Sequence, residues 1–288
     1  MRVILVPVAD RPECRIALDH AFHLADDLTA NVVGCHLRPH RSEDSPPSGP
    51  RFRLRVGRAA PLPARQGARE ADLKCRNARD LFMRHVKEHG YRAVKRPRLG
   101  KQRCAQWIEL VGAVDRLFCI AGPIADMSVV SRPKQNARGP GPEILLSALL
   151  HSGKPVLVLP QTPAPLSGQR ILVAWNQSVE AARAVSAALP LLRKASAVHI
   201  CSCGPENSLG PKAVHLAQYL TYWGVESRRL ITRGSDVPGE LEATCSDTDS
   251  DLVVMGAYSR NRMREIVFGG VTQHMLFRTA RSVFALHS

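Results

Sequence analysis

The stretch DLVVMGAYSRNRMREIVFGGVTQHML, residues 251–276, contains the pattern that decides the fold. Its apolar run, 252–255, has the composition of a buried strand and ends at Gly256. A basic loop follows, and the double glycine Gly269–Gly270 precedes a run with helical character. A strand, a loop and a helix in this order are typical of a unit in a parallel α/β sheet.

Outward from this stretch, strand-like and helix-like runs alternate through the second half of the chain. Ser178 is a plausible N-cap, Glu180 lies in the first turn that follows, and Pro190 should kink or shorten that helix. The predicted strands are RILVAW (170–175), AVHICSC (197–203), ESRRLIT (226–232), DLVVMGA (251–257) and SVFALH (282–287). The alternation predicts a mostly parallel sheet with helices on both faces, and ligands then bind at the carboxyl ends of the strands.

The first half repeats this pattern. The runs beginning at Arg2 and Gln169 open alike, and the runs beginning at Ile144 and Val271 close alike. The offset falls from 167 residues to 127, which leaves about 40 extra residues in the first copy. We therefore predict two domains, 1–162 and 168–288, that pack through their last strands, PVLVLP and SVFALH, because these apolar runs would otherwise be open sheet edges.

The extra residues coincide with the basic part of the chain. The net charge is +15, and residues 41–103 hold 18 Lys/Arg against 6 Asp/Glu. Residues 41–75 are rich in Pro, Gly, Ser and Arg, which predicts an exposed insertion that can be shortened with little loss of stability. The charge of 41–103 leaves nucleic-acid binding open as an alternative function. No apolar run is long enough for a membrane span, and the scattered cysteines favour a reduced, cytoplasmic protein.

The two-copy arrangement, together with the stretch at 251–276, resembles the universal stress protein family in its tandem form. The resemblance implies two doubly wound, mostly parallel five-stranded sheets, Rossmann-like, and ATP or another adenine nucleotide as ligand. Family members that bind ATP have a glycine, two residues, a glycine, nine residues, then a glycine and a hydroxyl residue. Gly256 and Gly269 match this pattern, whereas Ser259 replaces the second glycine and Gly270 the hydroxyl residue. Asn176 stands where the family has an aspartate.

The chemistry of this pattern supports a nucleotide site in the second half. Glycines let the backbone approach a phosphate, and the amide groups that open the next helix point at the anion. Thr272 could replace the missing hydroxyl. The predicted nucleotide-binding residues are Ala174, Trp175, Asn176, Gly256, Ser259, Arg260, Gly269, Gly270, Val271 and Thr272. In the first half Pro142 and Glu143 stand opposite Gly269 and Gly270, so this copy is predicted to have lost the site.

Nothing in the sequence indicates catalysis, and His199, Cys201 and Cys203 lie on alternate strand positions without an evident fourth metal ligand. The predicted function is therefore a stress-response protein that binds an adenine nucleotide and is non-catalytic or at most a slow ATPase. The predicted assembly is an intramolecular pseudo-dimer, and a homodimer stays open. A second alternative is an interaction or dimerisation module that has lost nucleotide binding.

Overall fold

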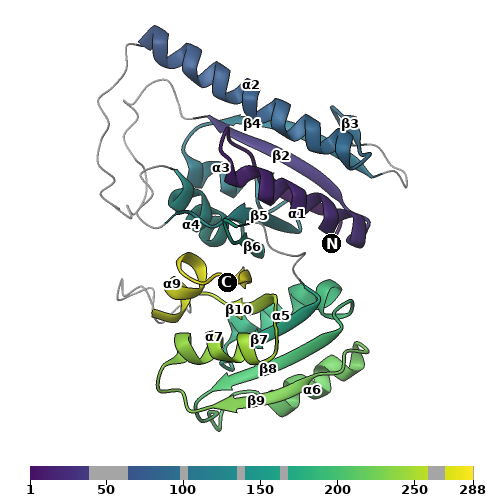
Figure 1. Ribbon diagram of the computed structural model, residues 1–288, viewed down its shortest axis with the longest axis vertical. Helices are drawn as coiled ribbons and strands as arrows, with labels where there is room; N and C mark the ends of the chain where they lie inside the picture. Colours follow the sequence, from purple (N-terminus) through teal and green to yellow (C-terminus); the bar gives the residue numbers. More distant parts are fainter. Residues whose placement is uncertain (39–63, 98–102, 135–139, 163–167, 259–269, 288) are drawn as a thin grey trace.

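The computed structural model describes residues 1–38, 64–97, 103–134, 140–162, 168–258 and 270–287 (Figure 1). Within these ranges the strands form one sheet in the order β3-β4-β2-β1-β5-β6-β11-β10-β7-β8-β9. The strands are β1 (Val3–Pro7), β2 (Asn31–Arg38), β3 (Arg92–Val94), β4 (Cys104–Val111), β5 (Met127–Ser131), β6 (Val156–Leu159), β7 (Arg170–Ala174), β8 (Ala197–Cys203), β9 (Arg228–Thr232), β10 (Leu252–Gly256) and β11 (Ser282–Leu286). The helices are α1 (Glu13–Leu28), α2 (Ala64–Glu88), α3 (Val114–Ala121), α4 (Gly141–His151), α5 (Val179–Leu192), α6 (Ala213–Tyr222), α7 (Val237–Asp247) and α9 (Gly270–Phe277).

The two halves have the same strand order, which confirms the predicted α/β fold. In the second half β9, β8, β7, β10 and β11 are neighbours in that order and all pair in parallel. The first half repeats the order with β4, β2, β1, β5 and β6, and adds the short strand β3 beyond β4. In each half the chain moves outward in one direction from its first strand and then returns to the other side, so the order reverses beside that strand.

The last strands of the two halves pair with each other, as the apolar runs predicted. β6 and β11 are antiparallel, with Val158 opposite Val283 and Val156 opposite Ala285. This pair is the point at which the two five-strand patterns merge into one continuous sheet (Figure 1). Whether the boundaries at 162 and 168 delimit independently folding domains stays a prediction.

Helices cover both faces of the sheet, and each face has its own apolar core that runs through both halves. One core combines α1, α2, α5 and α6 with strand residues such as Val173 and Phe284. The other combines α3, α4, α7 and α9 with strand residues such as Leu172 and Val253. Because neighbouring strand residues point to opposite faces, the continuous apolar runs seen in the sequence supply both cores at once.

The predicted N-cap of α5 is confirmed. The Ser178 hydroxyl accepts a hydrogen bond from the Ala181 amide at 3.1 Å and caps the helix. The helix ends at Leu192, two residues after Pro190, so the proline is tolerated close to the carboxyl end. None of the helices in the described ranges is both long enough and apolar enough to cross a membrane.

The predicted insertion at 41–75 is wrong in its second part. Residues 64–75 form the first three turns of α2, and Cys75 is buried. The helix is amphipathic, and Arg69 is exposed on its solvated face. A deletion through residue 75 would truncate α2 and should therefore destabilise the first half. Residues 41–63 lie outside the described ranges.

Candidate functional site

The carboxyl ends of β7 and β10 meet at the point where the strand order of the second half reverses. Ala174 lies opposite Met255 in this strand pair and is half-buried. Trp175 is buried in the core beneath α5 and α6, and its Nε1 donates to the Pro211 carbonyl at 2.8 Å. The indole is therefore committed to packing, and of the predicted base-side residues Asn176 is the one that is exposed.

Asn176 and the residue after it shape the turn that leads into α5. The Asn176 side-chain oxygen accepts a hydrogen bond from the Ser178 amide at 3.2 Å. Gln177 has a left-handed backbone, with φ of 61°, and its amide group bonds to the backbone of Asn207 in the loop after β8. The side chains of Asn176 and Gln177 thus both stabilise this turn. The Asn176 side-chain oxygen accepts the same backbone hydrogen bond that an aspartate carboxylate could accept.

Gly256, at the end of β10, is needed for the packing of α5. A Cβ atom at this position would lie 2.5 Å from the Ala181 amide nitrogen and 2.7 Å from the Glu180 carbonyl carbon. Both are backbone atoms of the first turn of α5, which cannot move aside as a flexible side chain could. The structural reason for this glycine is close approach of a helix, a role that the sequence analysis did not consider.

Gly270, Val271 and Thr272 form the first turn of α9. Gly270 is exposed, and a Cβ atom there would meet no atom of the described residues within 4 Å. Val271 and Thr272 are half-buried. The remaining predicted site residues, Ser259, Arg260 and Gly269, lie outside the described ranges.

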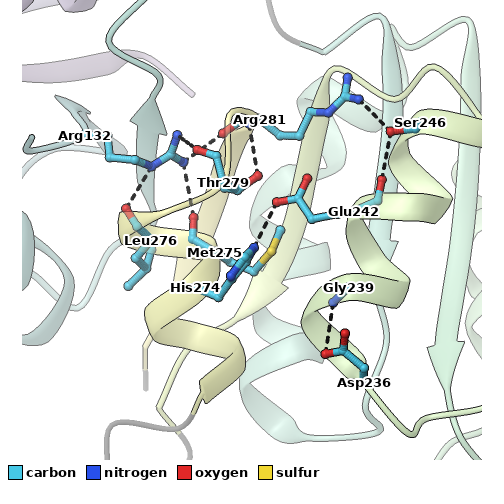
Figure 2. Close-up of polar contacts among 10 residues, drawn as sticks. All are labelled: Arg132, Asp236, Gly239, Glu242, Ser246, His274, Met275, Leu276, Thr279 and Arg281. Carbon is cyan, nitrogen blue, oxygen red and sulfur yellow. Dashed lines mark hydrogen bonds and ion pairs between the residues drawn. The ribbon is translucent and has the colours of Figure 1, made fainter. Parts of the chain in front are cut away.

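The other end of α9 is held by Arg132, a residue from the first half of the chain (Figure 2). Its guanidinium donates to the carbonyls of Leu276 at 2.9 Å, Met275 at 3.2 Å, Arg281 at 2.8 Å and Thr279. The first two carbonyls belong to the last turn of the helix and lack partners within it.

Arg132 is 4% exposed, and burial lowers its pKa to about 10. Arg132 therefore stays cationic at neutral pH. A positive charge at this position is stabilised by the negative end of the α9 helix dipole. This contact was not predicted. A single arginine after an apolar run has no sequence signature, because its partners are backbone carbonyls more than 140 residues away.

Polar contacts also join α9 and its following turn to α7 (Figure 2). His274 Nε2 lies 3.2 Å from a carboxylate oxygen of Glu242. Arg281 donates to the Ser246 hydroxyl at 3.1 Å. Together with the hydrogen bonds of Arg132, these contacts hold the carboxyl-terminal part of α9 and the turn after it in place. The position of the first turn of the helix is therefore set by the rest of α9.

The β9–α7 turn, at the same carboxyl edge of the sheet, is organised by one carboxylate. Glu240 accepts hydrogen bonds from the Thr232 hydroxyl and from the amides of Gly234 and Ser235, at 2.7 and 2.9 Å. These bonds, led by that from Thr232, lower the pKa of Glu240 from 4.5 to about 2. They stabilise the ionised form and with it the folded turn.

We expect Glu240→Gln to lower the melting temperature at neutral pH. A depressed carboxyl pKa contributes stability above the unfolded value, and the contribution is lost as pH falls toward the folded value. The difference in melting temperature between wild type and Glu240→Gln should therefore be largest above pH 5 and shrink toward pH 2. A difference that is constant with pH would show that the ionised carboxylate has no such role.

A cavity of about 420 Å³ lies in the first half. It opens beside the carboxyl end of β1, between the start of α1 and the side of α2. The Asp10 carboxylate within it accepts a hydrogen bond from Asn77 at 2.7 Å. The lining residues are Asp10, Arg11, Pro12, Arg15, Asn77, Asp80, Leu81 and Arg84. With three arginines against two aspartates, this cavity can receive a small anionic or zwitterionic group.

The residues that led to the prediction of a lost first-half site lie in α4. Pro142 is in its first turn, and Glu143 follows it. Burial raises the pKa of the Glu143 carboxyl above its ordinary value. The first turn of α4 therefore carries a proline and a carboxylate, whereas the first turn of α9, its counterpart in the second half, begins with Gly270.

Nearly the whole chain superimposes on several solved structures. A universal stress protein from Archaeoglobus fulgidus matches with a TM-score of 0.73 and 14% identity, over 99% of this chain and 98% of that chain. A protein from Pseudomonas aeruginosa UCBPP-PA14, provisionally assigned to the same class, matches at 0.59 and 16%, over 100% and 93%. A functionally unknown protein from Pseudomonas aeruginosa PAO1 matches at 0.58 and 14%, over 100% and 92%.

The chain therefore has the α/β fold of the universal stress proteins along nearly its whole length, as its sequence pattern predicted. No protein-family model and no curated protein sequence matches it.

Proposed function

We propose that the chain is a universal stress protein-like, stress-response protein that binds one adenine nucleotide at the carboxyl edge of β7 and β10. The observation that carries this proposal is the meeting of Ala174–Asn176 with the end of β10 at the reversal of strand order. Ligands of doubly wound sheets bind at this point. The fold shared with the universal stress proteins supports the same position.

The first turn of α9 is the proposed phosphate side of the site. Its amide groups provide donors and the positive end of the helix dipole. No atom of the described residues lies within 4 Å of a Cβ placed at Gly270, which would let a phosphate approach the backbone closely there. The exposed amide of Asn176 provides hydrogen-bonding groups for the ribose or base but no charge.

The proposed role is binding without turnover. The residues Ala174–Asn176 and Gly270–Thr272 include no carboxylate or histidine that could act as a general base. Arg132 and the α7 contacts hold α9 in place before any ligand arrives, which lowers the ordering cost of binding.

Gly270→Val should lower the affinity for ATP by roughly tenfold or more, since its side chain would occupy the space proposed for a phosphate. The melting temperature should be unchanged, because a Cβ atom at this position meets no atom of the described part of the chain within 4 Å. Calorimetric titration of ATP into both proteins is the measurement. Ala280→Val, which adds similar bulk at an exposed position beyond the other end of α9, is the matched control.

Other results would redirect the proposal. Equal ATP affinity in wild type and Gly270→Val would place the nucleotide elsewhere, with the first-half cavity as the next position to test. Two equivalent sites per chain would show that the first half has kept a site. Absence of binding to the wild type would favour an interaction module that has lost its nucleotide.

A further inference from the structure

Three potential metal ligands meet on the surface of the first half, away from the proposed nucleotide site. Asp19 and His23 are four residues apart on α1 and therefore lie on the same face of that helix. His89 is the residue directly after α2. One ring nitrogen of each histidine and one carboxylate oxygen of Asp19 all lie within 4.8 Å of one another.

We propose that Asp19, His23 and His89 bind one divalent transition-metal ion, of which Zn²⁺ is the best match. His89 Nε2 lies 3.4 Å from Asp19 Oδ1, and His23 Nδ1 lies 3.6 Å from the same oxygen. In a tetrahedral zinc site with bonds of about 2.0–2.1 Å, neighbouring ligand atoms are separated by about 3.3–3.4 Å. Both separations from the Asp19 oxygen are therefore within a few tenths of an ångström of those in a tetrahedral zinc site.

Ring packing holds His89 in this position. Its imidazole stacks on Phe22, with centroids 5.1 Å apart and planes 13° apart, and it lies parallel to His85 at 6.4 Å. The backbone amide of His89 donates to the His85 carbonyl at 2.9 Å. Gly90 then adopts φ of 65° and turns the chain away from the helix axis. A ligand fixed by packing in this way loses little freedom when it binds an ion.

His23 completes the site from α1. Its ring meets that of His89 edge to face, with centroids 4.7 Å apart. Its Nδ1–H also donates a hydrogen bond to the Asp19 carbonyl oxygen, at 2.9 Å. To bind an ion through Nδ1, the ring must release this proton and give up that hydrogen bond.

The site is open on its outer side. The exposed fractions of the side chains are 53% for Asp19, 41% for His23 and 12% for His89. An ion can therefore enter from solvent, and water can complete its coordination. Two imidazoles and one carboxylate are a ligand set that suits Zn²⁺, Co²⁺, Ni²⁺ or Cu²⁺, whereas Mg²⁺ and Ca²⁺ prefer oxygen ligands throughout.

The ion would join α1 to the end of α2, so its effect should be structural. Titration of Zn²⁺ into the chelator-treated full chain should give one site per chain and a rise in melting temperature of several degrees. Co²⁺ should give the visible absorption of a four-coordinate ion. Asp19→Asn, His23→Gln and His89→Gln should each weaken binding by roughly tenfold or more and abolish the thermal shift.

Two matched controls separate this site from adventitious binding. His274→Gln removes a histidine that pairs with Glu242 but has no second imidazole beside it, and should leave Zn²⁺ affinity unchanged. All proteins should carry Cys119→Ser, because Cys119 is an exposed free thiol.

The exposed Asp19→Asn keeps the shape of the side chain, so it tests the site even if a variant at His89 disturbs packing. Unchanged Zn²⁺ affinity in Asp19→Asn and His23→Gln would overturn the proposal and leave the cluster as a pair of histidines beside a carboxylate. Loss of ATP binding, in contrast, would have no bearing on this result.

Discussion

Replacement of Arg132 with methionine is expected to lower the free energy of unfolding by about 3–5 kcal/mol, since four carbonyls lose their donor and each buried polar group left without a partner costs about 1–3 kcal/mol. Methionine can fill the space of the arginine stem but has no donors for the carbonyls of Met275, Leu276, Thr279 and Arg281. Those carbonyls would remain buried without their partner, and each such group is costly. Denaturant unfolding of wild type and variant measures the loss.

Two further variants test the cause of this loss. Arg132→Lys keeps the charge near the end of α9 but lacks the planar fork, so it should recover only part of the stability. Arg278→Met removes an exposed arginine at the end of the same helix and should change the free energy by less than about 0.5 kcal/mol. Equal effects of Arg132→Met and Arg278→Met would show that the buried contacts to α9 contribute little.

The sequence contains most of the information for the fold, because the fold depends on patterns that are local and repeated. Apolar runs of strand length, separated by helical periodicity, identified the strands of the second half and their parallel arrangement. The internal repeat then extended the prediction to the first half. The pairing of β6 with β11 could be predicted since both runs are apolar and would otherwise be open sheet edges.

The fold prediction has two errors, and both arise because short or arginine-rich segments lack the apolar pattern expected of a helix or strand. Residues 64–75 contain arginines, glycine and few large apolar residues, so they were assigned to a loop although they begin α2. A helix that rests on the core by one narrow face needs few apolar residues, and its arginines remain in solvent. The short strand β3 was missed for a similar reason, because Arg92–Val94 is too brief to show alternation.

The candidate sites were harder to predict from the sequence than the fold. The glycine motif indicated the carboxyl end of β10 as the candidate position, but it could not show that Gly256 faces the backbone of α5. Spacing did not bring His89 together with His23, because 66 positions separate them and the contact arises from the packing of α1 on α2. The contacts of Arg132 could not be predicted from spacing either, since its partners are backbone atoms of the other half.

The two glycines of the predicted nucleotide motif that lie in the described ranges should respond in opposite ways to alanine. Gly256→Ala is expected to lower the free energy of unfolding by about 2–4 kcal/mol, from roughly 1–3 for overpacking and about 1 for a weakened helix cap. The new methyl group would lie 2.5 Å from the Ala181 amide nitrogen, which is also the donor to the Ser178 hydroxyl. The first turn of α5 would have to shift, and this cap would weaken with it.

Gly270→Ala is the matched control for Gly256→Ala, since it adds the same methyl group where no atom from the described ranges lies within 4 Å. It should be neutral or slightly stabilising, because alanine reduces the freedom of the unfolded chain. Urea unfolding of the three proteins makes the comparison. Similar stability of both variants would mean that α5 can retreat from β10 at little cost, and Gly256 would then be free for a role in ligand binding. A large loss confined to Gly256→Ala would instead show that this glycine is required for the fold itself, so that the nucleotide proposal must be tested through Gly270 and not through Gly256.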